Sequence, residues 1–332
     1  MLKFGIQVRP NCTPTEFVEH LRFVEKEGFD YAWIDDIGLH RETFILCALA
    51  SERTTKLRIG PGVTNPYTRH PGMLAAQVAT LQEISNGRSF LGLGLGGYTA
   101  LRQLGFTTWN KPVNTLREAI MISRRLLDGE NLTFDGSIFK LTNAKIDFRP
   151  KQRVPIYLGV MLGKQGLKMA GELCDGALVV GPLGRNQTRP VVDSIRKAAA
   201  DSGKDPESLE IAMAAPFSVS DNRTEAIELA KQSVAERAIL DERLRPAILA
   251  EGLTEEQISK VKNAAMRGDS LHEVVTDAMV DLFAIAGTVT DCIRKIEALK
   301  KTGITQLAVG RPARESPEML KIIGEEIIPN VR

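Results

Sequence analysis

The feature of this chain that most limits its fold is a repeated alternation of short apolar runs with longer stretches of helical periodicity. A strand of a buried parallel sheet gives a short apolar run, and the helix that returns the chain gives an amphipathic stretch, so the alternation is typical of βα units. Eight such runs predict strands over 3–8, 31–36, 57–65, 89–97, 155–161, 175–181, 210–220 and 305–312. The intervening stretches predict helices over 14–28, 42–53, 71–85, 113–128, 164–173, 188–202, 288–302 and 316–327.

Two segments interrupt this rhythm. Residues 130–153 carry alternating apolar residues around the turn pair Asp135-Gly136, so we expect an inserted β-hairpin there. Residues 224–285 are charged and helical in pattern, and they are too long for one crossover connection. We therefore expect two or more additional helices before the last strand.

Eight strands, each followed by a helix and joined without a Pro- or Ser-rich linker, predict one (β/α)8 barrel domain over residues 1–332. The alternative is an open, doubly wound sheet. That fold would place a GxGxxG turn directly after the first strand, and residues 8–13, VRPNCT, contain no glycine. The closed barrel is therefore the expected architecture.

The composition limits the classes of partner. Lys and Arg total 43 against 41 for Asp and Glu, a formal net charge of +2, which gives no electrostatic reason to expect nucleic acid or a membrane surface as a partner. The chain has no run of 18 apolar residues and no signal-peptide pattern at its start, so we expect a cytoplasmic protein. Its four cysteines and four histidines are scattered without metal-binding spacing, so we expect no metal site.

In a barrel of this kind the active site lies at the C-terminal ends of the strands. These ends contain few nucleophile–base pairs and many glycines, which suits a cofactor that supplies its own chemistry. The candidates are Gln7, Asp35, Asp36, Gly62 to Asn65, Gly94 to Tyr98, Gly159 to Lys164, Gly181, Pro182, Ser218, Gly310 and Arg311.

Four local patterns carry most of this prediction, and each has a structural alternative. GPGVTNP (60–66) suits a bulge that pushes backbone into the pocket, or simply a turn. LGLGLGG (91–97) lets a ligand approach the strand, or serves packing. LGVMLGKQG (158–166) leads into a helix N-terminus that could hold a phosphate, although Lys164 could equally be a solvated lysine. The pair Asp35-Asp36 could act as a base or anchor, or cap a helix.

Three further residues near strand ends are weaker candidates. His40 and His70 lie in the loops after the second and third strands, where either could contact substrate, although His70 precedes a proline and could only order the turn. Cys12 has no basic neighbour in the sequence, so we do not expect a reactive thiol.

Several runs of this sequence resemble one known family. They are AWIDDIGLHR, GPGVTNPYTRHP, TLQEISNGRSFLGLGLG, IYLGVMLGKQGLKMAGELCDGALV and IAGTVTDCIRKIEALKKTGITQLAVG. In this order they are similar to the bacterial luciferase-like (β/α)8-barrel superfamily, and most of all to the methylenetetrahydromethanopterin reductases that use the deazaflavin coenzyme F420. The resemblance covers nearly the whole chain, and GPGVTNPYTRHP is specific to that branch.

The resemblance implies a site. The deazaflavin ring would lie against a strand-three bulge with a non-prolyl cis peptide at Gly62-Val63, and Asp36 would lie near the ring. The phosphate-bearing tail would bind in the loop after strand five and near Gly181. The implied cofactor-binding residues are Asp36, Gly62, Val63, Thr64, Asn65, Gly96, Gly97, Gly159, Val160, Met161, Gly163, Lys164, Gln165 and Gly181, and the catalytic candidates are Asp36 and Gln7.

This chain departs from the family pattern at three positions. Ile37 stands where the family has a histidine, Gln7 where the reductases have a glutamate, and Gly97 where they have an acidic residue. A neutral amide does not ionise near pH 7, so Gln7 cannot be a general acid. We therefore expect coenzyme binding to persist and turnover of methylene-tetrahydromethanopterin to be slow.

The resulting hypothesis is a coenzyme F420-dependent oxidoreductase that passes a hydride between the deazaflavin and a small organic substrate, which could be a pterin. The alternatives are an FMN-dependent monooxygenase of the same superfamily and a non-catalytic cofactor-binding barrel. From the family habit and the apolar helix FILCALA (44–50) we also expect a homodimer or a higher homo-oligomer.

Overall fold

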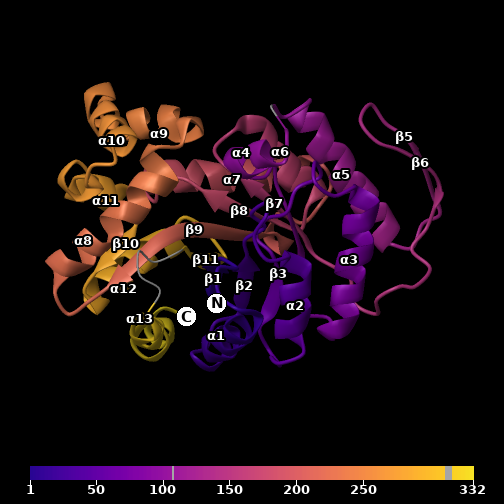
Figure 1. Cartoon of the computed structure of the whole chain (residues 1–332), viewed down its shortest axis with the longest axis horizontal. Helices are drawn as coiled ribbons and strands as arrows, with labels where there is room; N and C mark the ends of the chain where they lie inside the picture. Colours follow the sequence, from indigo (N-terminus) through magenta and orange to yellow (C-terminus); the bar gives the residue numbers. More distant parts are fainter. Residues whose placement is uncertain (107, 311–315) are drawn as a thin grey trace.

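The protein forms a ring of parallel strands surrounded by helices, as seen in a computed structural model that describes residues 1–106, 108–310 and 316–332 (Figure 1). The strands follow the order β3-β2-β1-β11-β9-β8-β7-β4, in which each neighbour pairs in parallel. Their bounds are β1 (Lys3–Val8), β2 (Tyr31–Ile34), β3 (Arg58–Pro61), β4 (Leu91–Leu93), β7 (Ile156–Val160), β8 (Gly176–Val180), β9 (Glu210–Val219) and β11 (Gln306–Gly310).

Two isolated bridges close the ring between β3 and β4. They join Ile59 to Ser89 and Thr64 to Leu93. The chain advances five positions from Ile59 to Thr64 but only four from Ser89 to Leu93, so the stretch after β3 contains the one-residue bulge that the resemblance implied. The (β/α)8 barrel is thereby confirmed.

Helices cover the outside of the ring. They are α1 (Pro14–Lys26), α2 (Thr43–Ser51), α3 (Pro71–Ile84), α4 (Tyr98–Gln103), α5 (Pro112–Leu127), α6 (Lys164–Leu173), α7 (Arg185–Asp201), α12 (Val289–Lys300) and the C-terminal series α13 (Pro317–Ile322), η5 (Ile323–Ile327) and α14 (Ile328–Val331). All eight helices expected between and after the strands are present within a few residues of their predicted bounds, and α4 was not predicted.

Local sequence explains where these helices begin. At α1, the Thr13 hydroxyl accepts a hydrogen bond from the backbone of Glu16, whose carboxylate accepts one from the backbone of Thr13. This reciprocal arrangement satisfies two amide donors that the first turn leaves unpaired. Thr288 and Asp291 repeat it at the start of α12.

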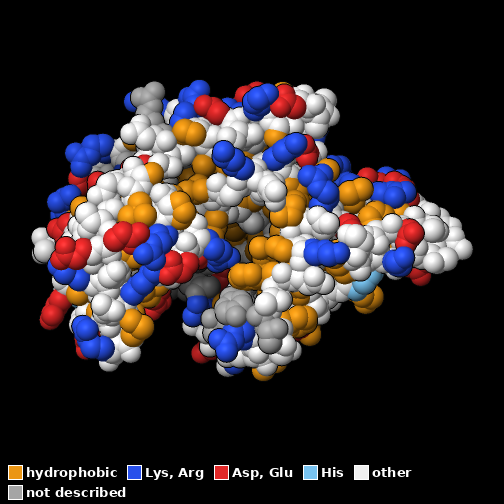
Figure 2. All heavy atoms as spheres, turned by 90° about the horizontal axis from the view of Figure 1, so that it is seen from above, with side chains coloured by type: hydrophobic (Ala, Val, Ile, Leu, Met, Phe, Trp, Pro, Cys, Tyr) orange, Lys and Arg blue, Asp and Glu red, His pale blue; other side chains and the backbone are white. Residues whose placement is uncertain are grey.

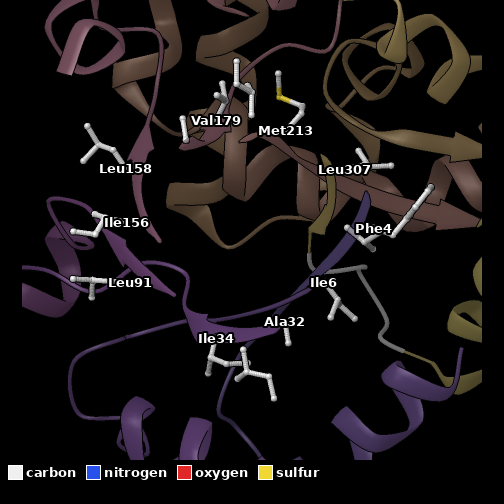
Figure 3. Packing of buried hydrophobic residues seen from close by; sticks show 14 of the residues in the cluster. Phe4, Ile6, Ala32, Ile34, Leu91, Ile156, Leu158, Val179, Met213 and Leu307 are labelled. Carbon is white, nitrogen blue, oxygen red and sulfur yellow. The ribbon is translucent and has the colours of Figure 1, made fainter. Parts of the chain in front are cut away.

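Side chains alternate between the two faces of each barrel strand. The outward residues pack against the helices and form the main hydrophobic core, as Figure 3 shows for residues such as Phe4, Ile34 and Leu158. The inward residues form a separate cluster that includes Tyr31, Trp33, Phe90 and Tyr157. Because strand side chains alternate with a period of two, each strand contributes to both clusters.

The N-terminal end of the barrel interior is polar as well as aromatic. Glu210 at the start of β9 accepts hydrogen bonds from the hydroxyls of Tyr31 at 2.7 Å and Tyr157 at 3.0 Å, and it pairs with Lys3. Burial alone would raise the pKa of Glu210, but these donors outweigh burial and hold its pKa below the ordinary value.

Two segments extend beyond the barrel. The strands β5 (Leu132–Asp135) and β6 (Lys140–Ala144) pair in an antiparallel hairpin, within the segment where the sequence predicted one. Between β9 and α12 the chain forms α8 (Arg223–Val234), η2 (Ala235–Ile239), η3 (Glu242–Leu244), α9 (Arg245–Ala250), α10 (Glu255–Arg267), η4 (Leu271–Glu273), α11 (Asp277–Phe283) and the short strand β10 (Ile285–Gly287).

The extra helices pack around their own hydrophobic cluster, which includes Val234, Ile248, Val261 and Val280. The strand β10 was not predicted, and it pairs with the end of β9 outside the ring. Within the described ranges, no helix is both long enough and apolar enough to cross a membrane.

Candidate active site

A cavity of about 660 Å³ opens where the C-terminal ends of the barrel strands meet the loops that follow them. Figure 2, which looks from the side on which α4, α9 and α10 lie, shows the molecule hollowed near its centre, with hydrophobic side chains in the wall. Ten of the predicted site residues line the cavity: Gln7, Asp36, Gly62, Val63, Gly96, Gly97, Gly159, Val160, Met161 and Gly163.

The predicted cis peptide between Gly62 and Val63 is present. Val63 then packs between the ends of β4 and β7, because a Cβ built on Gly94 would lie 2.5 Å from Val63 Cγ2 and one on Gly159 would lie 3.0 Å from its Cγ1. Glycines of two separate sequence patterns, LGLGLGG and LGVMLGKQG, are thus explained together. They make room for one valine, which forms part of the cavity wall with Gly94 and Gly159.

Gln7 lies on the inner face of β1, opposite Trp33 in the register with β2. Its side chain is almost fully buried and lines the cavity. An amide in this position can both donate and accept a hydrogen bond, but it cannot supply a proton by ionising near neutral pH.

Two donors hold the Asp36 carboxylate in place. Its Oδ2 accepts hydrogen bonds from Thr64 Oγ1 at 2.6 Å and from Arg69 Nη1 at 2.5 Å. Arg69 also donates to Glu42 at 2.7 Å. Burial alone would lower the pKa of Arg69, but the two carboxylates outweigh burial and raise it. Asp36 therefore presents a fixed carboxylate to the cavity.

Asn65 and Gly96 shape the edge of this region. Asn65 Oδ1 accepts from the backbone of Tyr67 at 3.1 Å and of Thr68 at 3.0 Å, which fixes the turn after the bulge. Gly96 has a φ of +76°, and a Cβ on it would lie 3.1 Å from the Asn65 amide. Asn65 lines a smaller side cavity of about 170 Å³, which shares Asp36 and Gly97 with the main one.

The N-terminus of α6 faces the main cavity. Gly163 precedes its first turn, offers no side-chain cap, and lines the cavity together with Gly166. The first intrahelical bond is donated by Leu167 to Gly163, so the amides of the first turn are available to a ligand.

Of the site residues that the resemblance implied, five do not line the main cavity. Thr64 donates a hydrogen bond that positions Asp36, and Asn65 fixes the turn after the bulge. Lys164 and Gln165 are exposed on α6, and Gly181 is buried against Leu162. Arg311, the last strand-end candidate, lies outside the described residues.

The histidine candidates have other environments. His70 Nδ1 accepts from the backbone of Gly72 at 3.1 Å and caps α3, and its ring packs edge-on against Phe139. Burial lowers the pKa of His70, which favours this neutral, accepting form. His40 is exposed, and neither histidine lines the main cavity.

The sequence patterns missed two arginines. Arg69 lies in the loop before α3, and Arg243 lies in η3 of the inserted helical segment, where it lines the cavity. Neither follows a barrel strand directly, so the strand-end rule could not select them.

Comparisons with known proteins identify the family of this chain. The profile of the luciferase-like monooxygenase family matches residues 3–306. The chain is 34% identical to a 5,10-methylenetetrahydromethanopterin reductase from Archaeoglobus fulgidus, with 100% of both chains covered. Among solved structures it is similar to the coenzyme F420-dependent tetrahydromethanopterin reductase from Methanopyrus kandleri, at 30% identity and a TM-score of 0.92, with 100% of this chain and 99% of that one covered.

A more distant likeness concerns the fold alone. The oxygenating component of 3,6-diketocamphane monooxygenase from Pseudomonas putida, in complex with FMN, is 18% identical with a TM-score of 0.74, and 100% of this chain and 99% of that one are covered. The profile match and the full-length identity to the reductases establish that this chain belongs to the luciferase-like monooxygenase family, in the branch that includes the 5,10-methylenetetrahydromethanopterin reductases.

Proposed function

We propose that the protein is a coenzyme F420-dependent oxidoreductase that transfers a hydride between the deazaflavin and a small organic substrate. The observation that carries this proposal is the cavity wall formed by Val63, Gly94 and Gly159, with the α6 N-terminus at the same cavity. Such a site suits a ligand with a flat ring and an anionic tail. The similar reductase structure from Methanopyrus kandleri is named for this coenzyme and supports the assignment.

The residues present fit a flat tricyclic ring. Glycines at Gly94 and Gly159 keep side chains out of the wall, so a planar group can lie against backbone and the Val63 methyl groups. The cavity volume of about 660 Å³ lies within the range of ordinary cofactor pockets. The aromatic side chains of Trp33, Phe90 and Tyr157 fill the interior of the barrel.

The tail of the coenzyme would bind at α6. Unpaired amides at a helix N-terminus, together with the helix dipole, favour an anionic group. Gly163 and Gly166 line the cavity at this point, and a Cβ on Gly163 would meet no atom within 4 Å. The exposed Lys164 would add only long-range attraction, so the backbone is the main element of this site.

Bound coenzyme supplies the hydride chemistry at C5 of its ring. The chain's own residues orient the reactants: Asp36, fixed by Arg69 and Thr64, accepts a hydrogen bond from a ligand group, and Gln7 donates or accepts one. The bonds to Arg69 and Thr64 fix the Asp36 carboxylate in one orientation. We therefore assign Asp36 to positioning, and proton transfer to solvent or substrate.

The substrate would be a small organic molecule of the pterin class, as in the similar reductases. In such a pterin a methylene group bridges two nitrogens. Its reduction is an oxidoreductase reaction at a CH–NH group. Gln7 lacks the acidity that would help such a reaction, so we propose slow turnover with methylene-tetrahydromethanopterin.

We also propose that the protein is a homo-oligomer, with a homodimer as its simplest form. Ile45 and Leu49 on α2 are 61% and 43% exposed, and Met73 on the neighbouring α3 is 58% exposed. Exposed apolar side chains of this size on two packed helices are typical of surfaces that pack against another chain. Light scattering that gives a monomer mass at working concentration would contradict this proposal.

Anaerobic turnover tests the proposed function. Reduced coenzyme F420 is mixed with the protein and methylene-tetrahydromethanopterin, and oxidation of the deazaflavin is followed by absorbance. Slow, enzyme-dependent oxidation is the expected result. Oxygen-dependent turnover with reduced FMN would favour the monooxygenase alternative, and binding without any turnover would favour a non-catalytic barrel.

A further inference from the structure

Arg243 is, in the described part of the chain, the one cationic side chain that lines the active-site cavity. It belongs to η3 in the inserted helical segment and lies near the mouth, with 47% of its side chain exposed. The two carboxylates in the same wall are Asp35 and Asp36, and Arg69 already pairs with Asp36. Arg243 is thus placed to meet an anionic ligand.

Asp241 holds Arg243 in one orientation. Its Oδ1 accepts from Arg243 Nε at 2.9 Å and its Oδ2 accepts from Nη2 at 2.7 Å, a bidentate pair. These hydrogen bonds raise the pKa of Arg243. Among the described residues Nη1 has no hydrogen-bond partner, so one edge of a pre-oriented guanidinium is available for a ligand.

Trp109 supports the same guanidinium from a different segment. The Arg243 Cζ atom lies 5.9 Å from the centre of the Trp109 ring, within range of a cation–π interaction. Trp109 Nε1 donates to the carbonyl of Leu95 at 3.0 Å, and Leu95 itself lines the cavity. Arg243 is therefore anchored to the end of β4 as well as to its own helical segment.

We propose that Arg243, positioned by Asp241 and Trp109, binds an acidic ligand group at the cavity mouth, either a carboxylate or a phosphate. The identity of the ligand rests on the proposed function. The acidic group could come from the coenzyme, whose side chain carries a phosphodiester and glutamates, or from the side chain of an acidic pterin substrate. Lys and Arg side chains around the hollow in Figure 2 agree with an anionic ligand.

The first test needs no coenzyme. Inorganic pyrophosphate is titrated into the protein, and tryptophan fluorescence is followed, since the chain has only Trp33, buried in the barrel, and Trp109 at the mouth. The wild type should show a saturable change, and Arg243→Gln should weaken it about tenfold or more. No saturable change in the wild type, or equal affinity in the variant, would overturn the inference.

A matched control removes the same charge elsewhere. Arg267 pairs with Asp269, also two residues away, and is 64% exposed on α10, outside the cavity. Arg267→Gln should leave pyrophosphate binding unchanged. A loss equal to that of Arg243→Gln would mean that overall charge, and not a site, explains the effect, and the inference would fail.

The second test separates the two sources of the acidic group. If the coenzyme supplies it, Arg243→Gln weakens binding of F420 but not of its ribityl deazaflavin core, which lacks the phosphate and glutamates. If the substrate supplies it, the variant raises KM for the pterin with kcat unchanged. Equal loss of F420 and core, or no change in any of these quantities, would refute the inference. A wild type that binds pyrophosphate but neither deazaflavin would refute only the proposed function.

Discussion

Arg69 Nη1 lies 2.5 Å from Asp36 Oδ2 at the edge of the cavity, and its Nη2 bonds to Glu42 at 2.7 Å. The Asp36 side chain is only 7% exposed and that of Arg69 20%. A carboxylate this well buried needs a partner, because desolvation of an unpaired charge is costly. The pair therefore gives the buried Asp36 carboxylate a counter-charge beside an apolar cavity.

Replacement of this arginine should be costly. Arg69→Met leaves Asp36 buried without its counter-charge, so we expect the free energy of unfolding to fall by about 3 kcal/mol. Coenzyme affinity should fall with it, because Asp36 loses its fixed position. Urea denaturation measures the first effect and fluorescence titration the second. In the exposed pair of Arg22 and Glu19 on α1, Arg22→Met should change neither quantity.

The packing of Val63 against Gly159 predicts that one substitution lowers stability and that a second restores it. In Gly159→Ala the new Cβ would lie 3.0 Å from Val63, so the valine must shift and the cavity wall must change. Such overpacking typically costs about 1–3 kcal/mol of stability. The double variant Gly159→Ala with Val63→Ala relieves the contact and should recover stability relative to Gly159→Ala alone. No recovery in thermal melts would show that the contact is not the cause.

The hydrogen bonds of Glu210 should make the free energy of unfolding depend on pH in the acid range. Its pKa is lowered in the folded state, so the stabilisation that it gives is present above its unfolded pKa of about 4.3 and is lost as the pH falls through its folded pKa. Glu210→Gln should therefore lower stability by roughly 2 kcal/mol at pH 7, and the difference should shrink as the pH falls below about 4.3.

The same comparison at an exposed carboxylate provides the control. Glu256 pairs with Lys260 on the surface of α10. Glu256→Gln should therefore leave the unfolding curve nearly unchanged, both at pH 7 and below about pH 4.3. A deficit in Glu210→Gln that stays constant on acidification would mean that the network with Tyr31, Tyr157 and Lys3 acts only through packing.

Gln7 is the position at which activity should change most. A glutamate at this buried site could act as a general acid, a role that typically contributes 10²–10⁴-fold. Gln7→Glu should raise kcat with methylene-tetrahydromethanopterin by about this factor and leave the coenzyme dissociation constant unchanged. Gln103→Glu makes the same change on the exposed surface of α4 and should have no effect. Unchanged kcat in Gln7→Glu would point to a different substrate.

The sequence predicted those features that depend on neighbouring residues. The barrel strands follow from short apolar runs, and Gly62, Val63 and Gly159 follow from local glycine patterns at strand ends. Strands three and four are shorter than predicted, because the chain after Pro61 bulges and rejoins β4 only at Thr64. The strand β10 has three residues, too few for a periodic pattern to appear.

The features that the sequence did not predict depend on tertiary contacts. Arg69 reaches Asp36 from a loop 33 residues further along the chain, and nothing in the run around it indicates that partner. Arg243 reaches the cavity only because η3 folds back over the barrel mouth. Conversely, Lys164 has the right sequence position for a phosphate ligand, but its side chain is exposed and lies outside the cavity wall.

The most direct test of the central claim is a fluorescence titration of the wild-type protein with coenzyme F420 and, in parallel, with FMN. We predict that F420 binds at a single saturable site and at least tenfold more tightly than FMN, and that Gly159→Ala weakens its binding. Tighter binding of FMN, or no saturable binding of F420, would contradict the assignment of this cavity to the deazaflavin.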